Sequence, residues 1–125
     1  MNQDRPTIVC LCGSVQFLER FDAACLAETL AGRIVLSVGS HLRSDAEIFA
    51  GLTGEEEKAA LGRLAELHRH KIDLADEILV INVGGYFGES TRAEIEYARQ
   101  MGKRIRWLEP SASGPDLKAA PSPAL

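Results

Sequence analysis

Short apolar runs alternate along this chain with longer segments in which apolar residues recur every three or four positions. Residues 7–11 (TIVCL) form a continuous, β-branched apolar run, which is typical of a strand buried on both faces of a parallel sheet. Three further runs, at residues 33–38, 77–83 and 104–108, have a similar character. The pattern therefore predicts four strands.

The segments between these strands have the spacing of amphipathic helices. In residues 15–31 the apolar residues Phe17, Phe21, Ala24 and Leu30 keep helical spacing. Gly32 is positioned to end this helix in the left-handed conformation. A second helix is predicted from Thr53, which has the spacing of a capping box with Glu56, to about residue 75.

This second helix has a stripe that we expect to face the sheet, consisting of Leu61, Leu64, His68, Ile72 and Ala75. A third helix is predicted over residues 91–101, with Gly102 at its end. Residues 39–53 have no periodicity and predict a long loop, of the kind that often forms a lid or a binding segment.

The resulting order, β-α-β-loop-α-β-α-β, predicts an α/β fold with a flavodoxin-like (doubly wound) parallel sheet of four to five strands flanked by helices. We expect the strand order 2-1-3-4. Ligands of such sheets bind beyond the carboxyl ends of the strands, where the chain reverses direction between strands one and three. Two loops meet at that point, at residues 12–16 and 82–91.

Composition and charge restrict the class of protein. The 125 residues are 46% hydrophobic and 26% charged, with no apolar run long enough for a membrane helix. We expect one domain at residues 1–109 and a disordered tail at 110–125, which is rich in proline and serine. The polar N-terminus predicts a cytoplasmic protein. The net charge of -4 argues against a nucleic-acid partner, so we expect a small-molecule ligand and no cofactor.

The cysteines and histidines do not have metal-ligand spacing. We expect the side chains of Cys10 and Cys12, two positions apart on the first strand, to point to opposite faces, which leaves them as buried free thiols without a shared metal. The imidazoles of His68 and His70 are expected about 200° apart around their helix. The sequence therefore predicts no metal site.

The two loops contain candidate binding and catalytic residues. Gly13 and Ser14 lie between a strand and a helix N-terminus, which suits a bound anion; the alternative is a tight turn with Ser14 as a cap. Glu94, near the start of the third helix, could act on a bound sugar. Alternatively, Thr91 and Glu94 form a capping box and nothing more.

Residues 88–98 (GESTRAEIEYA), followed by Gly102 and Lys103, resemble the signature of nucleoside 2-deoxyribosyltransferases and the related nucleoside 5′-monophosphate N-glycosidases. The turn Cys12-Gly13-Ser14 resembles the first loop of the monophosphate-specific branch, and the similarity covers residues 7–108. The resemblance implies that Glu94 is the nucleophile that attacks the anomeric carbon and displaces the base. It also implies that Gly13, Ser14 and Ser90 line the 5′ end of the substrate.

Three further residues of the two loops, Gln16, Asn82 and Gly88, complete the predicted substrate-binding set. The chain also departs from the family pattern. Cys10 replaces a tyrosine, Gln16 replaces an arginine, and the acidic residue expected on the second helix is missing. His68 could replace that acid as the proton donor to the leaving base; the alternative is a hydrogen-bonded core histidine.

Three other polar residues have less direct roles. Asp73 and Asp76 are expected to be structural, and His41 in the long loop could reach the base. The resemblance implies a homo-oligomer, with Arg92, Tyr97 and Met101 as candidates for its interface; the alternative for each is ordinary surface or core packing. The predicted function is cleavage or transfer at an N-glycosidic bond of a nucleoside or nucleoside 5′-monophosphate. The alternative is a non-catalytic nucleotide-binding or sensor module.

Overall fold

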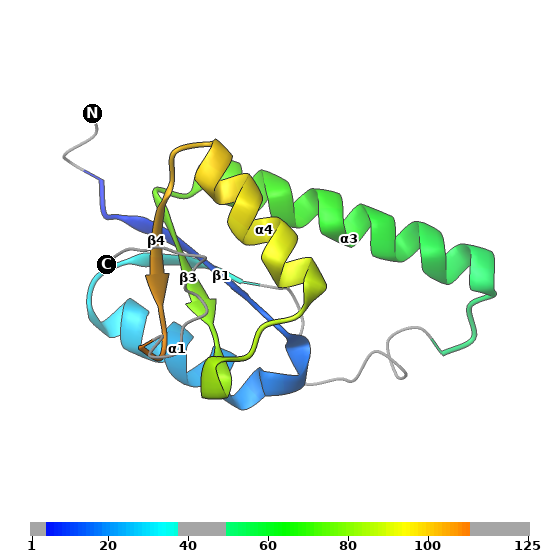
Figure 1. Cartoon of the computed structure of the whole chain (residues 1–125), viewed down its shortest axis with the longest axis horizontal. Coiled ribbons are helices and arrows are strands. Elements are labelled where there is room, and N and C mark those ends of the chain that lie inside the picture. Colours follow the sequence, from blue (N-terminus) through cyan, green and yellow to red (C-terminus); the bar gives the residue numbers. More distant parts are fainter. Residues whose placement is uncertain (1–4, 38–49, 111–125) are drawn as a thin grey trace.

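Four parallel strands form the centre of the computed structural model, in the order β2-β1-β3-β4 (Figure 1). The structure describes residues 5–37 and 50–110. The strands are β1 (Ile8–Gly13), β2 (Ile34–Leu36), β3 (Glu77–Ile81) and β4 (Arg104–Trp107). The predicted strand order and the flavodoxin-like α/β fold class are confirmed.

Three helices connect the strands, and their ends follow the local signals of the sequence. They are α1 (Leu18–Leu30), α3 (Gly54–Leu74) and α4 (Glu89–Gln100), with short 3₁₀ turns η1 (Val15–Phe17) and η2 (Val83–Gly85). Gly32 has a φ of 89°, as predicted for a residue that ends a helix. Thr53 and Glu56 form the predicted capping box at the start of α3.

Most of the predicted loop at 39–53, including His41, and the tail after Pro110 lie outside the described residues. None of the helices in the described ranges is long and apolar enough to cross a membrane.

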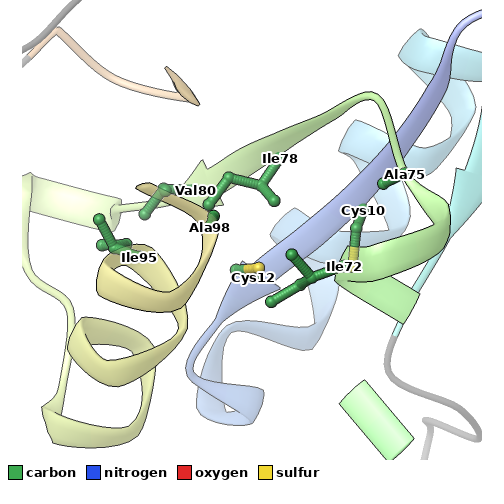
Figure 2. Packing of buried hydrophobic residues seen from close by; sticks show 8 residues of the cluster. All are labelled: Cys10, Cys12, Ile72, Ala75, Ile78, Val80, Ile95 and Ala98. Atoms are coloured by element: carbon green, nitrogen blue, oxygen red, sulfur yellow. The ribbon is translucent and has the colours of Figure 1, made fainter. Parts of the chain in front are cut away.

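The sheet is buried on both faces, and side chains along β1 alternate between two apolar clusters. Val9 and Leu11 pack with Phe21 and Ala24 of α1. Cys10 and Cys12 point to the other face, which α3 and α4 cover. Figure 2 shows this second cluster: Cys10, Cys12, Ile72, Ala75, Ile78, Val80, Ile95 and Ala98.

Only the C-terminal half of α3 packs on the sheet. His68 and Ile72 are buried, but Leu61 and Leu64 are exposed, so the prediction that the whole stripe faces the sheet is wrong. The reason is length: 21 residues of helix span about 31 Å, whereas the six residues of β1 span about 20 Å. The N-terminal half of α3 therefore extends past the sheet (Figure 1).

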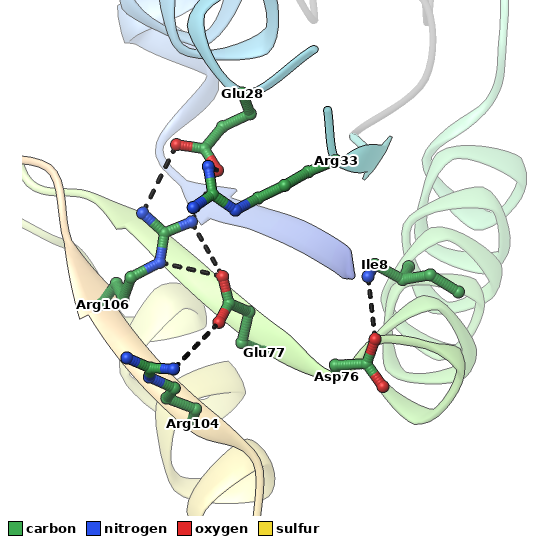
Figure 3. A network of polar contacts seen from close by, with 7 residues as sticks. All are labelled: Ile8, Glu28, Arg33, Asp76, Glu77, Arg104 and Arg106. Carbon is green, nitrogen blue, oxygen red and sulfur yellow. Dashed lines mark hydrogen bonds and ion pairs between the residues drawn. The ribbon is translucent and has the colours of Figure 1, made fainter. Parts of the chain in front are cut away.

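A salt-bridge network lies at one edge of the α1 face (Figure 3). Arg106 of β4 binds Glu28 of α1 at 2.6 Å and Glu77 of β3 at 2.9 Å. Glu28 and Glu77 are both buried. Arg106 therefore neutralises two buried carboxylates that come from different elements.

Asp76, directly before β3, connects that strand to the start of β1. Its carboxylate accepts hydrogen bonds from the Ile8 backbone N–H at 2.8 Å and from both terminal nitrogens of Arg5. These contacts, with the Arg5 bond the larger, lower the pKa of Asp76 to about 2. The structural role predicted for Asp76 agrees with these contacts.

Replacing Arg106 is expected to be far more destabilising than replacing Arg104. Arg106→Leu removes the shortest ion pair of each buried carboxylate. It leaves Glu28 with Arg33 at 3.3 Å and Glu77 with Arg104 at 3.9 Å, and should lower the free energy of unfolding by about 3 kcal/mol. Arg104 approaches Glu77 only at 3.9 Å and is 71% exposed, so Arg104→Leu should cost less than about 1 kcal/mol. Urea unfolding at neutral pH measures both, and equal losses would contradict the assignment.

The interactions of Asp76 predict that the stability of the fold depends on pH in the acid range. Because the folded-state pKa is lowered to about 2, the carboxylate stabilises the fold above its unfolded pKa of about 4, and this stabilisation is lost as pH falls towards 2. Asp76→Asn should cost about 1 kcal/mol at pH 7, since the carboxylate is 42% exposed. The difference between the two proteins should shrink between pH 4 and 2; a constant difference would refute this role.

Candidate active site

Four polar side chains from three elements meet on the face of the sheet that α3 and α4 cover. The sulfur atoms of Cys10 and Cys12, on β1, lie 3.7 and 3.5 Å from Nε2 of His68 on α3. The same nitrogen lies 3.7 Å from Oε1 of Glu94 on α4. The imidazole of His68 is therefore the centre of a cluster that connects β1, α3 and α4.

The two cysteines correct an expectation from the sequence. The prediction that their side chains point to opposite faces is wrong: both belong to the same buried cluster, on the side of β1 that contains Ile72 (Figure 2). The reason is that successive strand residues alternate between faces, so residues two apart share a face. The sequence argument that Cys10 and Cys12 cannot bind one metal ion together is therefore wrong as well.

Glu94 does not form the capping box that its spacing with Thr91 suggests. Helix α4 begins at Glu89, with Gly88 as the N-cap residue and no side-chain cap. Thr91 is therefore a buried residue inside the first turn, and Glu94 lies on the second turn, beyond the reach of a cap. The Glu94 side chain instead faces His68 and remains 23% exposed.

Burial and proximity change the proton affinity of these groups. Burial raises the pKa of the Glu94 carboxyl, against the attraction of His68, which lowers it. Burial opposes the charged form of His68, but Cys10 and Glu94 outweigh it and raise the imidazole pKa. Hydrogen bonding between the two thiols lowers the pKa of Cys10 and raises that of Cys12. The cluster thus raises the pKa of the imidazole, of the Glu94 carboxyl and of the Cys12 thiol, and lowers that of the Cys10 thiol.

The two loops that follow β1 and β3 meet, as the topology predicts. The ring of Phe17 in η1 packs edge-to-face on Tyr86, just after η2, at 6.2 Å between centroids. Because Cys12 is the penultimate residue of β1, the His68 cluster lies close to the strand end from which the first loop leaves. Glu94 is thus near the predicted ligand-binding edge of the sheet.

Gly13, Ser14 and Gln16 have local structural roles in the first loop. A Cβ atom at Gly13 would lie 2.9 Å from Cβ of Ile81, so glycine is required for the close approach of β1 and β3. The Ser14 hydroxyl accepts a hydrogen bond from the Gln16 backbone N–H at 3.3 Å and caps η1. The capping alternative for Ser14 is therefore observed, and the side chain of Gln16 is exposed.

Asn82 uses its amide to fix the chain after β4. Its Nδ2 donates to the Glu109 carbonyl and its Oδ1 accepts from the Glu109 N–H, both at 2.9 Å. The Glu109 carboxylate in turn accepts from the Gly84 N–H at 2.9 Å and pairs with Arg20 at 2.8 Å. Asn82 is thus occupied by the protein itself, and Glu109, which sequence reasoning missed, holds the second loop.

The remaining predicted residues lie around the start and the outer side of α4. Ser90 is exposed in the first turn, and a Cβ at Gly88 would lie 3.2 Å from the Tyr86 hydroxyl. Of the oligomer candidates, Arg92 stacks on the Phe87 ring at 5.3 Å and the Tyr97 hydroxyl donates to Asp73 at 2.5 Å. Met101 is exposed.

In comparisons with known proteins, no family model, no curated protein and no solved structure matches this chain. The resemblance to N-glycosidases and deoxyribosyltransferases therefore stays a prediction.

Substitutions of Asn82 and Gln16, which are both predicted to bind substrate, should change the free energy of unfolding by very different amounts. Asn82→Ala removes two hydrogen bonds to the Glu109 backbone and should lower the free energy of unfolding by about 2 kcal/mol. Gln16→Ala removes only an exposed side chain and should change it by less than about 0.5 kcal/mol. Chemical denaturation measures both. A neutral Asn82→Ala would show that its amide is not structural.

Proposed function

We propose that this protein cleaves, or transfers at, the N-glycosidic bond of a nucleoside or nucleoside 5′-monophosphate, with Glu94 as the nucleophile. The observation that carries the proposal is the position of the Glu94 carboxylate. It is free of a capping role, it lies 3.7 Å from an imidazole, and it is neither fully buried nor fully exposed. The sequence resemblance supplies the substrate class.

The chemistry that we propose follows the retaining route of glycoside hydrolysis. A Glu94 oxygen forms a bond to the anomeric carbon while the carbon–nitrogen bond breaks, and its electron pair leaves with the base. The base takes its proton from water. A second water molecule then attacks the anomeric carbon, and the bond to the Glu94 oxygen breaks, which releases the sugar and regenerates the carboxylate. The proton that this water loses neutralises the hydroxide left when the base was protonated. In a transfer reaction, a second base replaces that water.

We assign His68 to positioning Glu94 rather than to protonating the base. In retaining enzymes the acid and the nucleophile lie about 5–5.5 Å apart, on either side of the bond that breaks. Nε2 of His68 already contacts the nucleophile at 3.7 Å, and the side chain is 8% exposed. An imidazolium in this place favours the ionised carboxylate that a nucleophile requires. This revises the proton-donor role predicted from the sequence.

The 5′ end of the substrate is proposed to lie between the two loops. The start of α4 has no side-chain cap, and backbone N–H groups at such a terminus attract a phosphate or hydroxyl. Ser90 and Ser14 would flank it, as the resemblance implies.

A cytoplasmic location also remains part of the proposal.

A homo-oligomer is proposed as well. Helix α3 offers three exposed leucines to a second copy of the chain: Leu61, Leu64 and Leu67. Such residues on one protruding helix are typical of a surface that becomes buried on association.

Glu94→Gln should abolish turnover while ligand binding persists. The amide keeps the shape of the side chain but cannot form the glycosyl intermediate, so base release should fall by about 1,000-fold or more. The assay incubates the protein with a panel of nucleosides and 5′-monophosphates and separates released base by chromatography.

Glu96→Gln is the matched control, because Glu96 lies on the same helix, is exposed and pairs with Arg99 at 3.0 Å. It should retain native turnover. Base release by Glu94→Gln at the native rate would rule out the mechanism. Ligand binding by the native protein without any base release would instead favour the non-catalytic nucleotide-binding module.

A further inference from the structure

The atoms that surround His68 Nε2 are the kinds that bind soft divalent metal ions. Sγ of Cys10, Sγ of Cys12 and one ring nitrogen of His68 all lie within 4.8 Å of one another. All three residues are buried. We propose that Cys10, Cys12 and His68 bind one Zn²⁺ ion, with the Glu94 carboxylate at the fourth position; this site does not depend on the proposed function.

The distances between these atoms are close to those of a tetrahedral zinc centre. Zn–S bonds of about 2.3 Å and Zn–N bonds of about 2.0 Å, at tetrahedral angles, place sulfur and nitrogen about 3.5 Å apart. The sulfur–nitrogen distances in the cluster are 3.7 and 3.5 Å. Oε1 of Glu94 lies 3.7 Å from the same nitrogen, where a nitrogen and an oxygen on one tetrahedral zinc ion would be about 3.3 Å apart. The two thiols and the imidazole can therefore bind an ion with little change in the positions of their side chains.

The backbone already holds these ligands in place. Cys10 and Cys12 lie on β1, which pairs with both β2 and β3, so their Cα positions are fixed by the middle of the sheet. His68 lies in the part of α3 that packs on the sheet, four residues before the fully buried Ile72. Ligands on such rigid elements suit a defined tetrahedral geometry better than loop residues do.

The charges also favour a divalent ion. Two thiolates and a carboxylate supply three negative charges. Zn²⁺ supplies two positive charges, and the third comes from Lys71, which acts electrostatically on both Cys10 and His68. Lys71 is held in place by the Ser37 carbonyl at 2.5 Å. On binding, the two S–H protons and the Nε2 proton of a charged imidazole leave to solvent while two Zn–S bonds and one Zn–N bond form, without electron transfer.

Zinc bound in this way would occupy Glu94. If the proposed function holds, zinc and substrate therefore compete for the same carboxylate, and the metal-bound form is inactive. The binding of the ion is measured without any substrate, so the failure of one proposal does not imply the failure of the other.

The experiment uses the full chain without an affinity tag, reduced and freed of metal, with its three cysteines confirmed as thiols by a thiol count. Titration with Zn²⁺ against a chromophoric chelator should give one ion per chain. Titration with Co²⁺ should produce thiolate-to-cobalt charge-transfer absorption and the strong visible bands of a tetrahedral ion. The melting temperature should rise with zinc concentration.

Variants locate the site. Cys12→Ser, Cys10→Ser and His68→Gln should each weaken zinc binding by about 100-fold or more, because each removes a direct ligand. Cys25→Ser and His70→Gln are the matched controls, since Cys25 lies on α1 and His70 is an exposed residue of α3; both should bind like the native protein.

Two results would overturn the proposal. The first is a native, fully reduced protein that binds no zinc. The second is zinc binding that persists in Cys12→Ser and His68→Gln but is lost in a control variant. Because the native titration decides the first point alone, the proposal stays testable even where a buried substitution prevents folding.

Discussion

The contact of the His68 imidazole with β1 and α4 is the interaction on which the rest of this site depends. A central parallel strand is covered on both faces, so a polar side chain on it must find its partner inside the protein. On the α3 side of β1 those polar groups are the thiols of Cys10 and Cys12, and His68 supplies the partner for both. Glu94 then contacts the same imidazole from α4.

This arrangement fixes how α3 and α4 lie relative to the sheet. A shift of α3 by one residue would rotate His68 by about 100° away from the thiols, leaving buried polar groups unpaired at a cost of about 1–3 kcal/mol each. Ile72 and Ala75, which follow His68 along the chain, pack in the same buried cluster as Cys10 and Cys12. The register of α3 is therefore set by a polar contact and an apolar one together.

Much of the fold follows from local features of the sequence. Continuous apolar runs identify the four strands, the Thr53–Glu56 box marks the start of α3, and Gly32 ends α1. Strand order follows from right-handed crossovers. These features are predictable because each depends on a few neighbouring residues and on one periodicity.

The parts that sequence reasoning missed depend on residues far apart in the chain. The Asn82 amide binds the backbone of Glu109, 27 positions away, and no local pattern indicates that pair. Glu94 had the spacing of a cap, yet α4 begins two residues before Thr91 and leaves the carboxylate free. The shared face of Cys10 and Cys12, in contrast, was available from the alternation of strand side chains.

Catalysis and metal binding make different demands on the same four residues. A nucleophile requires Glu94 to be ionised and reachable, whereas a zinc site requires deprotonated thiols and a neutral imidazole. Both use the same contact, in which the Glu94 carboxylate lies 3.7 Å from Nε2 of His68. The account of the site therefore depends on His68 and on its contact with Glu94.

The most direct measurement is mass spectrometry of the protein after an acid quench during turnover of a nucleoside or nucleoside 5′-monophosphate. The quenched protein is then digested, and its peptides are weighed. The account predicts a mass increase equal to the (deoxy)ribosyl group, with or without its phosphate, on the peptide that contains Glu94. Release of base with no adduct, or with an adduct on another residue, would contradict it.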